Sequence, residues 1–335
     1  MKLPKRIQLA ILLAGGAAAA AAPTPVGRQI IALDGMWEVA EGSLAEQPAQ
    51  FTHTVPVPGL LDMAHPPFEQ PGSTIPEAQR RTVQRPADPR REAFWHRRTF
   101  TLEGPVPASA RLRLRKARYG VAVWVNGALV GEHDANFTPA EFDVRAHLRG
   151  DGATNEINVR VGASLAQVPP YRCEGWDFEK SRYIPGIYDS VELILTGEPY
   201  IRNIQVAPLP RYSSARLRVE LDRAWVGTAT VQIVEWPSRA PAGEGRLIWF
   251  GTDLADDEIA IRNPRTWSPE DPFLYEAIVS AGSDVARTRF GLRTFRTDPA
   301  TGRMLLNERP YYLRGSNVTI YRFFEDAERR ELPWD

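Results

Sequence analysis

The chain has 335 residues, carries 41 basic and 41 acidic side chains, and is 43% hydrophobic. At roughly 100–200 residues per domain, this length suits two folded units, and the hydrophobic content can build their cores. The net charge of zero removes the general electrostatic reason to expect binding to nucleic acid or to an anionic membrane surface.

The first 22 residues are expected to be a signal peptide. Three basic residues precede an alanine-rich apolar run over residues 7–22, which ends in an Ala-x-Ala-like cleavage site. An uncleaved anchor is the less favoured alternative, because a spanning helix needs about 20 apolar residues. No second run of spanning length follows. We therefore expect export to the periplasm or the extracellular space, and no membrane span.

The sequence offers no sign of a metal or cofactor site. The five histidines lack metal-ligand spacing, and nucleotide-binding and serine-hydrolase motifs are absent. His96 and His133 fall in strand-like segments, where we expect structural roles. Cys173 is the only cysteine, so no intrachain disulfide can form, and we expect a small buried side chain.

Residues 94 to 195 alternate between apolar and polar side chains, which is typical of half-buried strands. The Asn126-Gly127 pair lies between two such segments and predicts a tight hairpin, since both turn positions require positive φ. The alternating segments are Phe94–Leu102, Leu112–Leu114, Val121–Val130, Ile157–Val161 and Val191–Leu195.

A second alternating series starts after Pro199 and continues to residue 295. No stretch before Pro299 has the 3.6-residue apolar period of a helix, so the sequence predicts an all-β fold of two packed sandwiches. Residues 53–92 contain many prolines and little periodicity, and we expect them to form a long loop.

Several short motifs follow one another along the chain in a characteristic order. They are Leu33-Asp34-Gly35-Met36-Trp37, Phe94-Trp95-His96-Arg97-Arg98, Val123-Trp124-Val125-Asn126-Gly127, Pro185-Gly186-Ile187-Tyr188 and Phe290-Gly291-Leu292-Arg293-Thr294-Phe295. In order and spacing they resemble the N-terminal part of glycoside hydrolase family 2, which includes β-galactosidases, β-glucuronidases and β-mannosidases. The resemblance covers nearly the whole chain after the signal segment.

This resemblance implies a division of the chain into four parts. A signal peptide (1–22) would precede a galactose-binding-like jelly roll that binds sugar (23–199), an immunoglobulin-like sandwich (200–297) and the start of a TIM barrel (298–335). In the family the barrel carries both catalytic glutamates, and such a barrel takes about 250 residues. We therefore expect a truncated product, one part of a split protein or a fragment.

The resemblance also implies candidate sugar contacts. Gly175-Trp176-Asp177-Phe178 is similar to the loop that reaches over the barrel in β-mannosidases and β-glucuronidases, where the aspartate binds the terminal sugar. A carboxylate accepts hydrogen bonds from two hydroxyls, and an indole packs on a pyranose face. The alternative is that Trp176 is a core aromatic and Asp177 a turn residue.

Asn317 corresponds to a family asparagine at the barrel mouth, where active-site residues collect. The histidine that often follows two positions later is Thr319 here, so that contact is not implied. No carboxylate pair matches the family's catalytic motifs, and no catalytic residue is predicted.

Three functions follow as hypotheses. The chain is the non-catalytic part of an exported family 2 glycoside hydrolase, with a separately encoded barrel as a conceivable partner and a β-glycoside as substrate. Alternatively it is a stand-alone carbohydrate-binding module, or a structural protein. The segment after Pro299 favours the first hypothesis, because a dedicated binding module has no use for one barrel strand.

Overall fold

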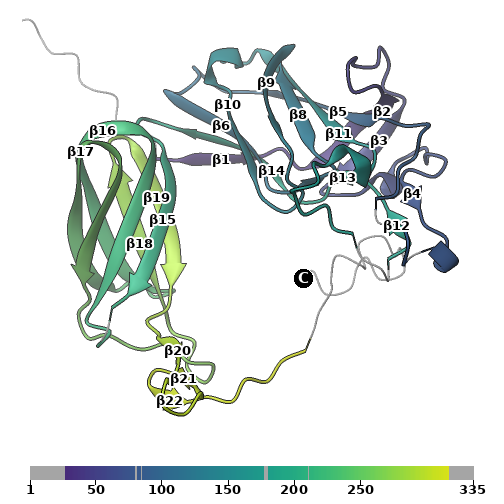
Figure 1. The fold of residues 1–335 in the computed structure, drawn as a ribbon. Coiled ribbons are helices and arrows are strands. Elements are labelled where there is room, and N and C mark those ends of the chain that lie inside the picture. Colours follow the sequence, from purple (N-terminus) through teal and green to yellow (C-terminus); the bar gives the residue numbers. More distant parts are fainter. Residues whose placement is uncertain (1–26, 80, 84, 177–179, 210, 317–335) are drawn as a thin grey trace, which may run out of the picture.

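The computed structural model describes residues 27–79, 81–83, 85–176, 180–209 and 211–316 (Figure 1). Within these ranges the chain is built from strands, and the only helical segments are four short 3-10 turns. The predicted all-β fold is confirmed. None of the helical segments in this part of the chain is long and apolar enough to cross a bilayer. The 3-10 turns are η1 (Leu61–Met63), η2 (Glu77–Gln79), η3 (Arg145–His147) and η4 (Leu165–Gln167).

The first sandwich consists of a four-stranded and a six-stranded antiparallel sheet. The smaller sheet has the order β1 (Gln29–Ala32), β14 (Val191–Thr196), β6 (Ser109–Leu114), β10 (Ala140–Asp143). The larger sheet has the order β3 (His53–Val57), β2 (Gly35–Gly42), β5 (Ala93–Thr101), β11 (Thr154–Gly162), β8 (Val121–Val125), β9 (Ala128–His133). Two short pairs add β4 (Ser73–Thr74) with β12 (Arg182–Tyr183) and β7 (Ala117–Arg118) with β13 (Gly186–Ile187).

One core fills the space between these two sheets. The inward-facing residues of β8 and β11 are buried in it together with those of β6 and β14, as the alternating pattern predicts. The predicted hairpin between β8 and β9 is confirmed, with Asn126 and Gly127 at φ of 51° and 84°. Asn126 also fixes the neighbouring loop, because its Nδ2 donates to the carbonyl of His147 at 2.7 Å.

The expected long loop over residues 53–92 is wrong at its start. Residues 53–57 form β3, the edge strand beside β2. Pro56, within the strand, and Pro58, just after it, argued against a strand in the sequence. An edge strand tolerates proline, because the backbone on one of its sides needs no hydrogen-bond donor. After β3 the segment is irregular, and Leu60, Leu61 and Phe68 bury a second small core against the sandwich.

The second sandwich is built from β15 (Ile201–Pro208), β16 (Ser214–Trp236), β17 (Pro241–Ala260), β18 (Leu274–Ala281) and β19 (Asp284–Phe290). β16 and β17 are long, and their register is broken between residues 220 and 226. The first arm of β16 pairs with β15, and its second arm pairs with β18. β16 and β17 thus each contribute to both layers of the second sandwich, which enclose one core.

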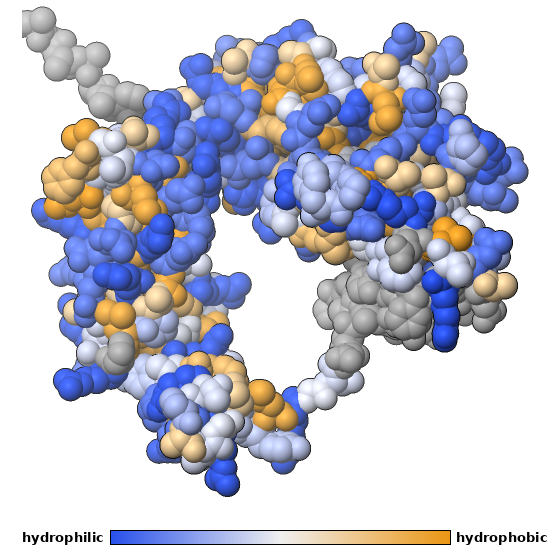
Figure 2. Space-filling model, in the orientation of Figure 1, coloured by the Kyte–Doolittle hydropathy of each residue, from blue (hydrophilic) through white to orange (hydrophobic). Residues whose placement is uncertain are grey.

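Apolar side chains remain exposed near the bend of β16 and β17. Val226 is 76% exposed and lies opposite Phe250, which is 82% exposed. Figure 2 shows apolar colour at this end of the second sandwich, whereas charged and polar residues cover most of the remaining visible face.

Buried charges join the two sandwiches. Asp284 at the start of β19 is fully buried, and Arg28 from the first sandwich donates to it through Nε at 3.0 Å and Nη2 at 2.5 Å. The same carboxylate accepts hydrogen bonds from the Thr196 hydroxyl at 2.8 Å and the Ile201 amide at 2.7 Å. The carboxylate of Asp284 therefore connects residues on both sides of the junction.

The segment after the second sandwich folds back on it. β20 (Phe295–Thr297), β21 (Met304–Leu306) and β22 (Arg309–Pro310) form a small sheet, so the expected boundary at 297/298 falls between paired strands. Asn307 anchors this sheet, since its Nδ2 donates to the Trp267 carbonyl at 2.9 Å and its Oδ1 accepts from the Thr294 amide at 3.2 Å.

Candidate functional site

Trp176, the predicted sugar contact, lies partly buried in a loop at one end of the first sandwich. Its Nε1 donates a hydrogen bond to the Val83 carbonyl at 3.0 Å. The ring packs against a small cluster formed by Ile75, Tyr119, Leu165, Val168 and Tyr183. The indole therefore contributes to the packing of this loop. Asp177 and Asn317 lie outside the described residues.

The loop before Trp176 is held by the segment that follows β9. Asn136 is fully buried, and its Nδ2 donates to the Glu174 carbonyl at 3.0 Å. The Tyr188 hydroxyl donates to the Asn136 carbonyl at 2.5 Å. Burial raises the pKa of Tyr188 to about 12, so the hydroxyl stays a neutral donor at physiological pH. Sequence reasoning missed both residues, because an Asn in a loop and a Tyr just after a short strand are ordinary.

Gly175 allows this loop to lie close to the post-β9 segment. Its φ is +80°, and a Cβ atom there would lie 2.9 Å from the ring of Phe137. A side chain is therefore excluded on both conformational and steric grounds. Cys173, in the same loop, is exposed, so its predicted burial is wrong. The loop has no alternating pattern that would have indicated which side chains face the core.

A buried cation lies beside the same loop. Arg118 is 3% exposed, and its Nε donates to the Ile184 carbonyl at 2.9 Å. Its guanidinium carbon is 5.6 Å from the ring centroids of both Tyr119 and Tyr188, within cation–π range. This burial has no signature in the local sequence, because β7, which carries Arg118, has only two residues and so shows no alternating pattern.

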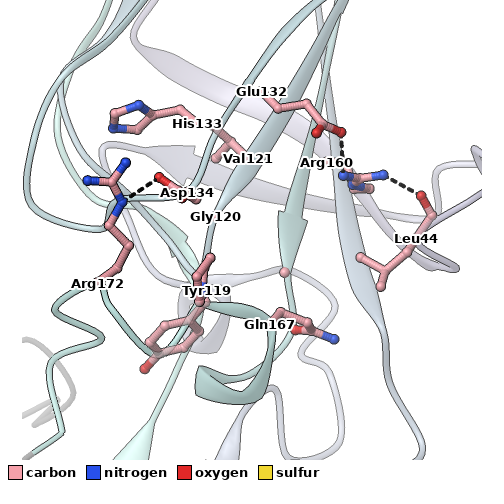
Figure 3. A pocket seen from close by; sticks show the side chains of 12 residues that line it. Leu44, Tyr119, Gly120, Val121, Glu132, His133, Asp134, Arg160, Gln167 and Arg172 are labelled. Carbon is pink, nitrogen blue, oxygen red and sulfur yellow. Dashed lines mark hydrogen bonds and ion pairs between the residues drawn. The ribbon is translucent and has the colours of Figure 1, made fainter.

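A cavity of about 630 Å³ opens next to this loop (Figure 3). Two ion pairs stand on opposite sides of it: Arg172 Nε lies 2.9 Å from Asp134 Oδ1, and Arg160 Nη2 lies 3.2 Å from Glu132 Oε1. Tyr119 lines the cavity and also belongs to the cluster on which Trp176 packs. The cavity and the candidate loop are therefore neighbours.

Pairing with arginine keeps a carboxylate at the cavity ionised. The hydrogen bond from Arg172 lowers the pKa of Asp134 below its usual value, with a smaller contribution from the Tyr171 hydroxyl. Asp134 is therefore ionised at neutral pH. No group of three or more His, Cys, Asp or Glu side chains in the described part of the chain is arranged to hold a metal ion.

The comparisons with known proteins agree with the fold. The sequence model of glycosyl hydrolases family 2 matches residues 200–293, which is the second sandwich. The chain is 25% identical over 246 residues to β-galactosidase BgaC of Bifidobacterium adolescentis, covering 66% of this chain and 23% of the relative. It is 24% identical over 251 residues to β-glucuronidase of Rattus norvegicus, covering 67% of this chain and 37% of the relative.

Solved structures extend this likeness over both sandwiches. A β-glucuronidase of Ruminococcus gnavus superposes with a TM-score of 0.61 at 19% identity, covering 86% of this chain and 47% of that one. A β-D-glucuronidase of Dictyoglomus thermophilum gives 0.57 at 21% identity, with the same coverages. The chain thus spans about half of these structures and less of the curated relatives. In sequence over the second sandwich and in fold over both sandwiches, the chain is thus similar to the N-terminal region of glycosyl hydrolases of family 2.

Proposed function

We propose that the chain is the non-catalytic N-terminal portion of an exported family 2 glycoside hydrolase, in which it shapes the substrate pocket and supports the barrel. The observation that carries the proposal is the likeness over both sandwiches to solved β-glucuronidases, of which the chain covers about half. Curated relatives that include a β-galactosidase and a β-glucuronidase support hydrolysis of O-glycosyl bonds as the activity of the whole protein.

The loop ending at Trp176 supplies the pocket wall in this proposal. Asn136 and Gly175 hold the loop up to Trp176 against the first sandwich. The Asp177 carboxylate would accept hydrogen bonds from sugar hydroxyls across the top of the barrel. The barrel itself, with both catalytic carboxylates, would be supplied by another segment or a separate chain.

The purified chain is expected to show no turnover of nitrophenyl β-galactoside, β-glucuronide or β-mannoside above the blank. The physical reason is that retaining hydrolysis needs two carboxyl groups about 5–5.5 Å apart on either side of the scissile bond. The measurement is release of nitrophenol, with an intact family 2 β-glucuronidase as positive control. Turnover by this chain that survives repurification would contradict the non-catalytic assignment.

Export is expected to remove the first 22 residues. Expression of the whole sequence in a bacterial host should yield a protein in the periplasm or medium whose N-terminus, by mass spectrometry, is Pro23. A matched variant with Lys2, Lys5 and Arg6 replaced by glutamate should remain uncleaved in the cytoplasm. Recovery of uncleaved wild-type chain only in the cytoplasm would refute export.

A stand-alone carbohydrate-binding module is the second candidate. One observation favours it: the polar cavity beside β9 is complete within this chain. Binding there would require no barrel.

A further inference from the structure

The cavity beside β9 has the size and position of a ligand site. Its volume of about 630 Å³ falls within the roughly 300–1,000 Å³ of typical small-molecule sites. It is lined from four parts of the first sandwich: Leu44, residues 119–121, residues 132–134 at the end of β9, and residues 160–172. Polar and apolar surfaces are both present, since Leu44 and Val121 also line it.

The charges that line the cavity cancel. Arg160 and Arg172 are each paired with a carboxylate, Glu132 and Asp134 respectively. An anionic ligand would meet as many negative as positive groups among the described lining residues, which present no uncompensated cation of the kind that phosphate or uronate recognition uses. A neutral ligand meets no such repulsion.

The paired guanidinium and carboxylate groups are suited to hydrogen bonding with the hydroxyls of a ligand. A guanidinium has five N–H donors and a carboxylate several acceptor sites, so the pairs leave donors and acceptors available at the cavity wall. The Arg172 and Glu132 side chains are 48% and 64% exposed, and thus accessible to a ligand. Figure 3 shows the two pairs on opposite sides of the space, with His133 near the Arg172–Asp134 pair. A polyol could bond to both sides at once.

An aromatic ring stands at the rim of this arrangement. Tyr171 is 77% exposed, and its hydroxyl donates to Asp134 Oδ2 at 3.3 Å. The Arg172 guanidinium carbon lies 5.4 Å from the centre of the ring. The ring is therefore positioned beside the polar wall although it contributes little to any core. An exposed aromatic next to paired donors and acceptors is the combination that recognises the apolar face and the hydroxyls of a pyranose.

We propose that this cavity binds a neutral saccharide, with its hydroxyls on the Arg172–Asp134 and Arg160–Glu132 pairs and a pyranose face on Tyr171. The site goes beyond the pocket-shaping role proposed above and gives the second candidate function a location, because it is formed by the first sandwich alone and needs neither Asp177 nor a barrel. It would serve as an accessory subsite that holds a glycan chain on the non-catalytic domain.

The test is calorimetric titration of the whole chain with three probes: lactose as a neutral disaccharide, D-glucuronate as an anionic sugar, and inorganic phosphate. Lactose is expected to bind with a dissociation constant in the millimolar range, and the two anions more weakly. Tyr171→Ala and Arg172→Gln should each weaken lactose binding about tenfold, by loss of the stacking ring or of the donors. Tyr312→Ala, at a tyrosine that is 79% exposed elsewhere, should leave binding unchanged.

Absence of lactose binding, or tighter binding of glucuronate or phosphate, would overturn the proposal. Equal weakening by Tyr171→Ala and Tyr312→Ala would also overturn it. Thermal unfolding of each variant checks that the loss is not caused by misfolding, which is not expected at side chains this exposed. The outcome is independent of the nitrophenyl glycoside assay, so failure of the subsite and failure of the proposed function are distinguishable.

Discussion

Replacing Asp284 with alanine is expected to lower the free energy of unfolding by about 3–5 kcal/mol. The substitution leaves the Arg28 guanidinium, whose side chain is 15% exposed, without its carboxylate, and the Thr196 hydroxyl and Ile201 amide without their acceptor. Breaking a buried pair in this way costs more than the pair contributes, because a charge remains desolvated. Urea unfolding at pH 7 measures the change.

Asp271→Ala is the matched control for Asp284→Ala. Asp271 also pairs with an arginine, at 3.1 Å from Arg265 Nη2, but both side chains are more than half exposed. Its loss should change the free energy of unfolding by at most about 1 kcal/mol. If the two variants were equally stable, Asp284 would not be the charge that fixes the junction of the sandwiches.

His96 is expected to make the stability of the first sandwich depend on pH. The ring lies in β5 between Val39 and Val159 of the adjacent strands, and neither ring nitrogen makes a well-formed hydrogen bond with a described residue. Burial lowers its pKa from 6.5 to about 4, and the backbone of Val159 and Phe94 opposes the shift only in part. The folded state therefore holds a neutral imidazole.

The direction in which stability changes with pH follows from the difference in proton binding between the folded and the unfolded chain. Between pH 6.5 and about 4 the unfolded chain takes up a proton at His96 that the folded chain does not, so stability falls as pH falls through this window. The loss attributable to His96 should reach roughly 3 kcal/mol at the acidic end. His96→Leu, which has a similar volume, should abolish this part of the pH dependence in urea unfolding at pH 7 and pH 4.5.

His65→Leu serves as the control, since His65 is exposed and should leave the pH dependence of the wild type intact. Carboxylates with lowered pKa values, such as Asp134 and Glu38, contribute in both proteins and cancel in the comparison. A His96→Leu protein that loses as much stability as the wild type at pH 4.5 would show that His96 is not responsible.

Local patterns predicted the strands well where one face is buried and the other is not. The alternation around Val121–Val125 and Ile157–Val161 indicated the correct faces, and the Asn126-Gly127 turn followed from positive φ alone. The apolar run Tyr311-Tyr312-Leu313 resembles a strand in sequence, but no strand is formed there, and Tyr312 and Leu313 are exposed. A strand needs a neighbouring strand to pair with along its length, and periodicity alone cannot show whether one is present.

Only part of the candidate site could be predicted from the sequence. The resemblance indicated the loop at Trp176, but not that Asn136 and Tyr188 hold it or that Arg118 is buried beside it. These contacts join residues up to 66 positions apart, and each residue type is ordinary in its own segment. Local composition therefore carries no information about them.

The sequence by itself determined the all-β class and, through motif order, the resemblance to family 2 glycoside hydrolases. Both depend on short-range features: side-chain alternation, turn residues and motif spacing. Tertiary structure alone decided that β16 and β17 each serve two layers, that Asp284 is buried at the junction of the sandwiches, and that two ion pairs face each other across one cavity. These features arise from packing of distant segments, where burial, and not local pattern, decides which polar groups must find partners.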